Sequence, residues 1–262
     1  MPFTTSHPAV VLLLKNLFPK QMSLTGLIAG AMAPDLLYFL EMNTVNRGMS
    51  HSWMGMFTIC LPLGLLFSFA FHYLFKKELI EHLPTPLLKH FSGLAYSKWQ
   101  IKSFSKFFIL IISVLIGTLS HFAWDSCTHL HGEVVQSFPI LQENLVLFGG
   151  HIRFFHLLQH LSTIVGGVAV IIYFAYQSNL PKRVAIQNHI PRIQKLSFWV
   201  IIPVLSGIFA YLVLHLYMYF APERIASERA VFGLAGWAGF FYLVIALDIF
   251  KKLQRKFKKS TS

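Results

Sequence analysis

The sequence predicts an all-α, polytopic membrane protein with about five to six transmembrane helices. Of its 262 residues, 55% are apolar and only 12% are charged, whereas about 25% of the residues of a soluble domain are charged. Five stretches are apolar and long enough to cross a bilayer, namely 55–75, 107–123, 154–176, 197–220 and 230–250. A sixth stretch, 24–40, is ambiguous because Pro34 and Asp35 interrupt it, so it either spans the bilayer or re-enters it.

Two short helices and a loop are expected before the first full span. Residues 8–18 are too short to cross a bilayer at about 1.5 Å per residue, so they suit an interfacial or buried helix. Pro8 fits the first position of that helix, and because a residue before proline is pushed toward extended backbone, His7 is expected just outside the helix start. Residues 24–40 are rich in glycine and alanine, which permit close approach of helices. Residues 41–54 read as a polar loop.

Basic residues alternate in density between the spans. Residues 76–106 hold six lysines, residues 179–195 hold four basic residues and the tail from 251 holds six, whereas residues 124–153 hold one. By the positive-inside rule, we expect the three basic segments, and with them the C-terminus, to be cytoplasmic in a bacterial inner membrane. The end of the second full span, which carries Asp125, is then expected to face outward. Because the basic residues of this chain of net charge +12 sit between spans, nucleic acid is not the expected partner.

The chain is expected to form a single membrane-embedded domain, because it shows no internal repeat and no low-complexity tract. No cleavable signal peptide is expected, since no positive charge precedes the first apolar run. Neither Cys60 nor Cys127 is expected to form a disulfide. Within the domain 1–262 we expect an N-terminal part, a central part with most of the candidate site, and a C-terminal part, over 1–54, 55–178 and 179–262.

The candidate functional residues are ionisable groups at the edges of apolar segments, where they are costly to keep. They are His7, Asp35, His51, His121, Asp125 and His129. In a helix over 118–131, steps of about 100° per residue place His121, Asp125 and His129 within about 80° of one another, whereas Cys127 points away. Imidazole and carboxylate without a thiolate are the ligand set of a catalytic zinc or a related divalent ion.

Other ionisable residues are weaker candidates. His160, near the outer end of its span, is a candidate ligand of a second metal ion, and His156, four residues earlier, is a weaker one. Glu41, Glu133 and Glu143 lie on the expected outer side, and nothing in the sequence selects among them as a catalytic base.

The same residues carry a family resemblance over most of the chain. The chain resembles an uncharacterised bacterial multi-pass membrane family, domain of unknown function 4184, and is similar to membrane-bound metal-dependent hydrolases and, more distantly, to zinc-dependent phospholipase C. The motifs are Pro2-Phe3-Thr4-Thr5-Ser6-His7-Pro8-Ala9, Met32-Ala33-Pro34-Asp35, Ser50-His51, Leu119-Ser120-His121 with Trp124-Asp125 and Thr128-His129, and Leu158-Gln159-His160.

This resemblance implies a phospholipase C-like metal site at the outward end of the helices. Asp35 and Asp125 would be the catalytic carboxylates, with Asp35 like the bridging carboxylate. The phospholipase pattern ends in a His-xxx-Glu pair, but Ile164 stands four residues after His160, so the resemblance implies one or two ions rather than three. The implied ligands are His7, Asp35, His51, His121 and Asp125, with His129 and His160 as looser matches.

We therefore expect a membrane-bound hydrolase of a phosphoester or lipid-linked substrate that uses metal-activated water, with zinc as the expected cofactor. A transporter or channel, in which the cluster binds or relays an ion, is the alternative. A haem protein is a weaker third reading. An ion path calls for ligands near the bilayer midplane and in the cytoplasmic half as well, so their collection at one end favours the enzyme. Nothing in the sequence indicates the oligomeric state.

Overall fold

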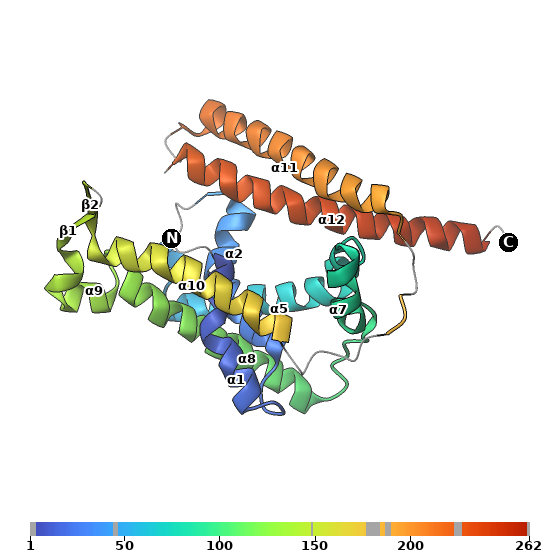
Figure 1. Cartoon of the computed structure of the whole chain (residues 1–262), viewed down its shortest axis with the longest axis horizontal. Coiled ribbons are helices and arrows are strands. Elements are labelled where there is room, and N and C mark those ends of the chain that lie inside the picture. Colours follow the sequence, from blue (N-terminus) through green and yellow to red (C-terminus); the bar gives the residue numbers. More distant parts are fainter. Residues whose placement is uncertain are drawn as a thin grey trace. The chain divides into compact units, whose positions relative to one another are not determined.

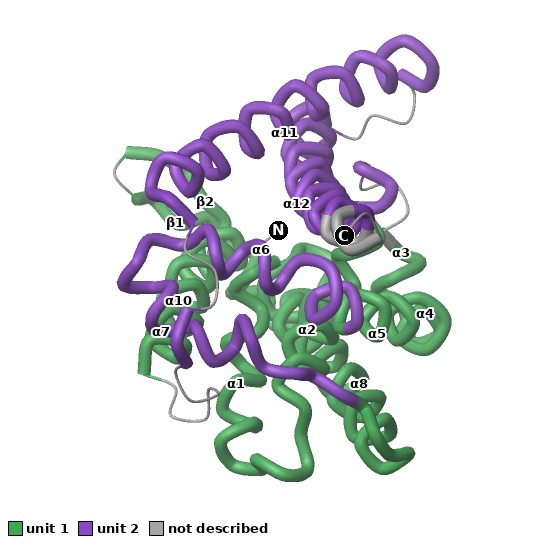
Figure 2. The backbone as a smooth tube through the Cα atoms, turned by 90° about the vertical axis from the view of Figure 1, so that its right-hand side faces the viewer, with its two compact units in different colours: residues 1–37, 48–68, 101–177 green, residues 38–47, 69–100, 178–262 purple. Residues whose placement is uncertain are grey.

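The computed structural model describes residues 4–43, 47–147, 149–176, 184–186, 190–222 and 227–260. These residues form two compact units (Figure 2). Unit 1 comprises residues 1–37, 48–68 and 101–177, and unit 2 comprises residues 38–47, 69–100 and 178–262. The expected organisation as one domain, with parts divided after residues 54 and 178, stays a prediction.

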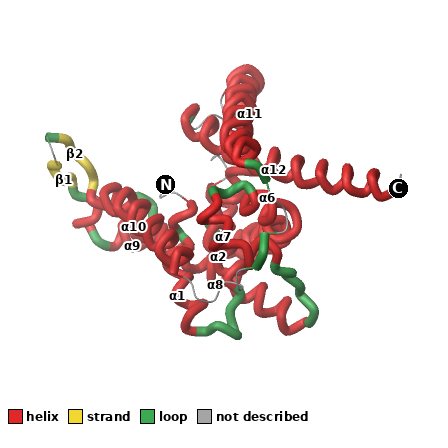
Figure 3. Tube along the Cα trace, turned by 45° about the vertical axis from the view of Figure 1, so that its right-hand side comes forward, coloured by secondary structure: helices red, strands yellow, loops and turns green. Residues whose placement is uncertain are grey.

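Helices dominate the described part of the chain (Figures 1 and 3), which confirms the predicted all-α, multi-pass class. The stretch that Pro34 interrupts is among the helices long and apolar enough to cross a membrane. The first full span is longer than expected, because it continues past residue 75. The six candidate spans are Leu24–Glu41, Trp53–Glu81, Phe104–Ser137, Phe154–Tyr176, Arg192–Phe220 and Glu228–Gln254.

Unit 1 begins with the 3-10 turn η1 (Thr4–Ser6), which leads directly into helix α1 (Pro8–Leu17). Pro8 occupies the first turn as predicted, but the expectation of an extended His7 is wrong. His7 has φ −57° and ψ −37°, and its amide donates to the carbonyl of Thr4 at 3.3 Å. The preceding turn therefore keeps His7 in right-handed backbone despite the proline that follows it.

Helices α2 (Leu24–Glu41) and α8 (Phe104–Thr128) approach each other closely at glycines, as the small residues of α2 predict. A Cβ added at Gly30 would lie 2.0 Å from the carbonyl oxygen of Val114, and one added at Gly117 would lie 2.4 Å from that of Leu27. Proline lacks an amide hydrogen, so Pro34 cannot bond the carbonyl four residues earlier. The Thr118 hydroxyl donates to that Gly30 carbonyl at 3.3 Å.

The expected loop over 41–54 contains two short helical segments in its described part. They are α3 (Arg47–Ser50) and α4 (Trp53–Gly55), where Ser52 caps the second by accepting a hydrogen bond from the Gly55 amide at 2.9 Å. The rest of the first full span consists of the π-helical segment η2 (Met56–Cys60), α5 (Leu61–Ala70), the π-helical segment η3 (Phe71–Phe75) and α6 (Lys76–Glu81).

The region after α8 also differs from the expectation. The helix was expected over 118–131, but it ends at Thr128, and Gly132 directly precedes α9 (Glu133–Ser137). A Cβ at Gly132 would lie 2.3 Å from the Ser126 carbonyl oxygen, which explains the glycine. The chain continues through the 3-10 turn η4 (Pro139–Gln142), the antiparallel hairpin of β1 (Asn144–Leu147) and β2 (Gly150–Arg153), and α10 (Phe154–Tyr176).

Unit 2 contains α6, α7 (Thr85–Tyr96), α11 (Arg192–Phe220) and α12 (Glu228–Ser260). Helices α11 and α12 pack along each other. The buried carboxylate of Glu78 on α6 binds Lys251 on α12 at 2.5 Å. On α7, the Tyr96 hydroxyl donates to Glu81 on α6 at 2.9 Å. The basic segment expected between spans is therefore partly helical, and its buried carboxylates are held by an ion pair and a hydrogen bond.

Replacing Gly30 with alanine is expected to destabilise the protein, because the new Cβ would overlap the backbone of α8 and overpacking costs about 1–3 kcal/mol. Thermal unfolding in detergent should show a lower Tm. Gly207→Ala in α11 is the matched control, since nothing lies within 4 Å of its added Cβ. An unchanged Tm for Gly30→Ala would contradict the close approach of the two helices.

Candidate metal centre

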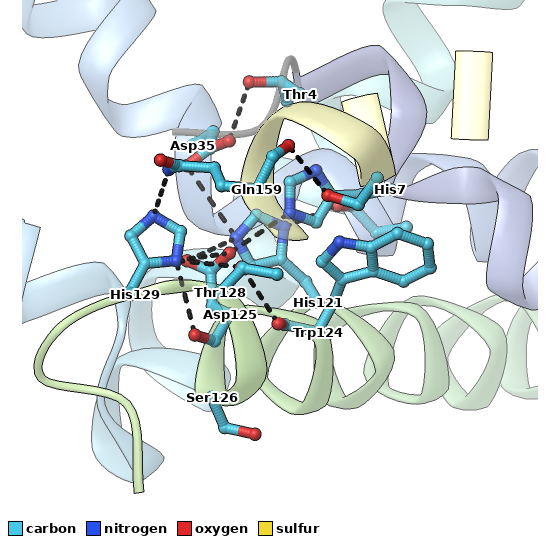
Figure 4. A network of polar contacts seen from close by, with 12 residues as sticks. Thr4, His7, Asp35, His121, Trp124, Asp125, Ser126, Thr128, His129 and Gln159 are labelled. Atoms are coloured by element: carbon cyan, nitrogen blue, oxygen red, sulfur yellow. Dashed lines mark hydrogen bonds and ion pairs between the residues drawn. The ribbon is translucent and has the colours of Figure 1, made fainter. Parts of the chain in front are cut away.

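Unit 1 brings together six of the seven residues expected to bind metal, and Figure 4 labels all of these except His51. The segments that carry them are far apart in sequence. His7 lies between η1 and α1, Asp35 lies in α2, and His51 follows α3. His121 and Asp125 lie on α8, and His129 directly follows that helix.

Asp125 lies at the centre of the cluster. Its Oδ1 atom is 3.3 Å from His7 Nε2 and 3.3 Å from His129 Nδ1. Its Oδ2 atom is 3.6 Å from His51 Nε2 and 3.6 Å from His121 Nε2. One carboxylate therefore faces four histidines, two on each oxygen.

Asp35 faces two of these histidines with one oxygen only. Its Oδ1 atom is 3.6 Å from His51 Nε2 and 3.8 Å from His121 Nε2. Its other oxygen accepts a hydrogen bond from the Thr4 hydroxyl at 2.7 Å. The family resemblance assigns the bridging role to Asp35, whereas the arrangement here gives Asp125 the larger number of histidine neighbours.

Hydrogen bonds on the far side of the rings orient the histidines. His121 Nδ1 lies 2.8 Å from the carbonyl oxygen of Ala31. Because a carbonyl only accepts, Nδ1 carries the hydrogen, and in the neutral ring the Nε2 lone pair then faces the carboxylates. His51 Nδ1 lies 3.1 Å from the Ser50 hydroxyl. Such partners fix the ring orientation of metal-binding histidines in proteins.

Among the described residues, two groups of ligand atoms lie close enough to hold a metal ion, with all atoms of each group within 4.8 Å of one another. One is formed by His7, His121 and Asp125, and the other by Asp35, His51 and His121. The nitrogen–oxygen distances of 3.6 to 3.8 Å within the second group and to Asp125 Oδ2 are too long for hydrogen bonds. Two ligand atoms at about 2.0–2.1 Å from a tetrahedral zinc stand about 3.3–3.4 Å apart. The donors therefore fit a divalent ion after a small contraction.

Burial supports the same interpretation. His7, Asp35 and His121 are almost fully buried. Among the residues that the structure describes, Asp35 Oδ1, His121 Nε2 and His7 Nδ1 are buried atoms without a hydrogen-bond partner. Orphaned buried polar atoms are costly and call for an explanation, for which a bound ion is one of the ordinary answers.

His129 joins the cluster in a different way from the expectation. It lies beyond the end of α8 in extended backbone, with φ −122° and ψ 143°. Its Nδ1 faces Asp125, and its Nε2 lies 3.4 Å from Nε2 of Gln159. His129 is in neither ligand group, so its position is that of a partner of Asp125.

The structure does not bring His160 to the cluster. Its side chain is exposed on α10, as is that of His156, and the two rings lie 6.4 Å apart. The buried neighbour Gln159 reaches the site instead. Sequence reasoning missed Gln159 and Thr4 as site residues, although both belong to the quoted motifs, and an amide in an apolar helix was the available signal for Gln159.

The cysteines and the glutamates considered as a catalytic base do not belong to the ligand groups. Cys60 and Cys127 are free thiols, as predicted, and neither belongs to a ligand group. Glu133 and Glu143 are exposed, so their side chains are not buried in the cluster. Glu41 belongs to unit 2.

Fold and site together define a multi-pass helical membrane protein with a buried cluster of histidines and aspartates in unit 1. The chain matches the family described as "Domain of unknown function (DUF4184)" over residues 1–248, and it belongs to that family. No curated protein matches the chain. No solved structure matches it.

Asp125→Ala is expected to remove bound metal while the helical fold is kept, because it deletes the carboxylate that faces four histidines. Cys127→Ala, two residues away on the same helix, should keep the metal and is the matched control. The measurement is elemental analysis of protein never exposed to a chelator, with circular dichroism to check the fold. Less than about a tenth of an equivalent of any transition metal in the wild type would contradict a metal centre.

Proposed function

We propose that this protein is a membrane-bound, metal-dependent hydrolase that cleaves a phosphoester. The observation that carries the proposal is the convergence of two carboxylates on the Nε2 atoms of His51 and His121, at distances too long for hydrogen bonds and near the spacing of ligands around one ion. We propose one or two ions, with zinc as the expected metal, because the donors are nitrogen and oxygen without a thiolate.

The residues fit such an ion in chemistry as well as in spacing. Asp35, His51, His121 and Asp125 would hold it, and the carbonyl of Ala31 would keep His121 in the tautomer that can bind. When bound, the ion would lower the pKa of water and stabilise charge on a phosphoryl oxygen. The two carboxylates would offset the positive charge of the ion in a buried place.

The carboxylates then differ in what they can do during hydrolysis. The reaction forms a bond between the water oxygen and phosphorus and breaks the bond between phosphorus and the ester oxygen, which leaves as an alcohol after gaining a proton. Asp35 is held by Thr4 and closed off from solvent, whereas the side chain of Asp125 is partly open. Asp125 is thus the carboxylate that can take a proton from water and return it to the leaving oxygen.

An ion transporter explains the cluster less well. A transport path needs polar groups at successive depths along its length. Here the ligand atoms converge within 4.8 Å in each group, and three of the residues that carry them are almost fully buried. A compact, buried cluster of this kind suits tight binding of a resident ion better than its passage.

Hydrolysis of a water-soluble phosphoester tests the proposal. Purified protein should cleave p-nitrophenyl phosphate or its diester, lose activity with a chelator and regain it with zinc. Asp125→Ala should lower kcat/KM by more than the about 10–100-fold that loss of an outer partner of a metal ligand costs. Cys127→Ala should retain full activity. Metal-loaded protein that cleaves neither ester would contradict the proposed reaction.

We further propose that the metal cluster faces away from the cytoplasm and that the C-terminus is cytoplasmic, in a bacterial inner membrane. The support is the distribution of basic residues, six in 76–106 and one in 124–153.

A pair of exposed positions tests this topology. In a background without Cys60 and Cys127, Glu143→Cys should react with a membrane-impermeant thiol reagent in intact cells. Lys102→Cys should react only after the cells are broken. The reverse labelling pattern would place the cluster on the cytoplasmic side.

A further inference from the structure

Three of the six side chains of the cluster are closed off from solvent and three are partly exposed. The side chains of His7, Asp35 and His121 are 1%, 1% and 0% exposed. Those of His51, Asp125 and His129 are 12%, 11% and 11% exposed. A substrate would therefore meet the cluster at His51, Asp125 and His129, and we call these three partly exposed residues the opening of the cluster.

Apolar side chains flank the His51 end of this opening. The Phe122 ring lies 6.1 Å from the His51 ring and 6.3 Å from the Trp53 ring, between centroids. Trp53 is 68% exposed, and it is one of four exposed apolar side chains within six residues of His51 in the chain. We name this set the Trp53 strip, and it comprises Met49, Trp53, Met54 and Phe57.

Polar groups surround the other end of the opening. His129 Nδ1 lies 3.2 Å from the Thr128 hydroxyl, and His129 Nε2 lies 3.4 Å from the Gln159 amide nitrogen. The opening is thus apolar beside His51 and polar beside His129. This division matches a molecule with an apolar tail and a polar head.

The position of the opening relative to the membrane surface also suits a molecule with an apolar tail and a polar head. The first full span begins at Trp53, two residues after His51. Tryptophan is enriched where a span meets the membrane surface. The phosphate groups of bilayer lipids lie in this interfacial layer, outside a hydrocarbon core about 30 Å thick. A span that enters the bilayer at Trp53 would place His51 near the level of the lipid phosphates.

We propose that the substrate is a bilayer lipid phosphoester that reaches the cluster sideways from the membrane, with its phosphate between His51 and Asp125 and its apolar chain along the Trp53 strip. This inference rests on the proposed hydrolase function and adds the substrate class and the route of access. Trp53 is then a specificity-determining residue for the apolar chain rather than a catalytic residue.

Binding of two non-hydrolysable phosphonates to metal-loaded protein tests this inference. Hexadecylphosphonate carries the apolar chain and methylphosphonate lacks it. Trp53→Ala should weaken hexadecylphosphonate binding about tenfold, since a buried apolar contact is lost, and leave methylphosphonate binding unchanged. Titration calorimetry in detergent measures both, and metal content confirms that the variant is intact.

Phe108→Ala is the matched control, because Phe108 is an exposed aromatic residue on the same helix as Phe122, about 21 Å away along its axis. It should change the binding of neither ligand. Met54→Ala, at a second position of the strip, should weaken the long-chain ligand selectively and replaces Trp53→Ala if that variant loses metal.

The outcomes separate this inference from the function on which it rests. Equal effects of the strip substitutions on both phosphonates, or no effect on either, would overturn the lipid route. Wild-type protein that binds methylphosphonate as tightly as hexadecylphosphonate, while cleaving soluble esters, would also overturn it and leave the hydrolase standing. Failure to cleave any ester with metal bound would instead remove the proposed function.

Discussion

The candidate centre depends on the backbone contact between α2 and α8. Gly30 and Gly117 let the two helices approach so closely that side-chain atoms cannot be placed between them. At this distance His121 on α8 donates to the Ala31 carbonyl of α2 at 2.8 Å, and the same ring faces Asp35. A larger residue at either glycine would separate the helices and with them the two halves of the ligand set.

The negative charge of two buried carboxylates favours a bound cation in the cluster. Asp35 and Asp125 would repel each other as carboxylates, and burial adds a cost that histidines in their neutral form do not repay. A divalent cation lowers both terms at once, because it compensates two negative charges and satisfies the facing lone pairs. The Thr4 hydroxyl donates a hydrogen bond to the Asp35 oxygen that does not face the histidines. The other Asp35 oxygen is therefore left for the expected ion.

Much of the site could be predicted from sequence, and the failures have physical reasons. Ionisable residues in apolar segments stand out, and spacing by four on a helix placed His121 and Asp125 together. The residue at which a helix ends is harder to predict, and α8 was expected to continue beyond Thr128, where it ends. On α10, neighbouring residues differ by about 100°, so Gln159 faces the cluster while His160 is exposed.

The hydrogen-bonding partners of the ligands were also missed, since no sequence period marks them. Thr4 contacts Asp35 across 31 positions in the chain, a distance that only the packed fold reveals. The five full spans were predicted, because apolar length is a property of the local sequence, whereas the stretch over 24–40 was left open between spanning and re-entering. In the bilayer core the backbone must satisfy its own hydrogen bonds, so a long apolar segment forms a helix there.

Pro34 leaves the Gly30 carbonyl without its usual partner within the helix, and this affects how the spans assemble. The carbonyls of Gly30 and Ala31 are consecutive, and each accepts a hydrogen bond from α8, one from Thr118 and one from His121. A slip of α8 by one residue along α2 would break both bonds and bury the Gly30 carbonyl without its partner. Helices that insert separately and associate afterwards therefore have one preferred alignment here. An ion bound at the proposed centre would favour the correctly aligned pair over every shifted one by mass action.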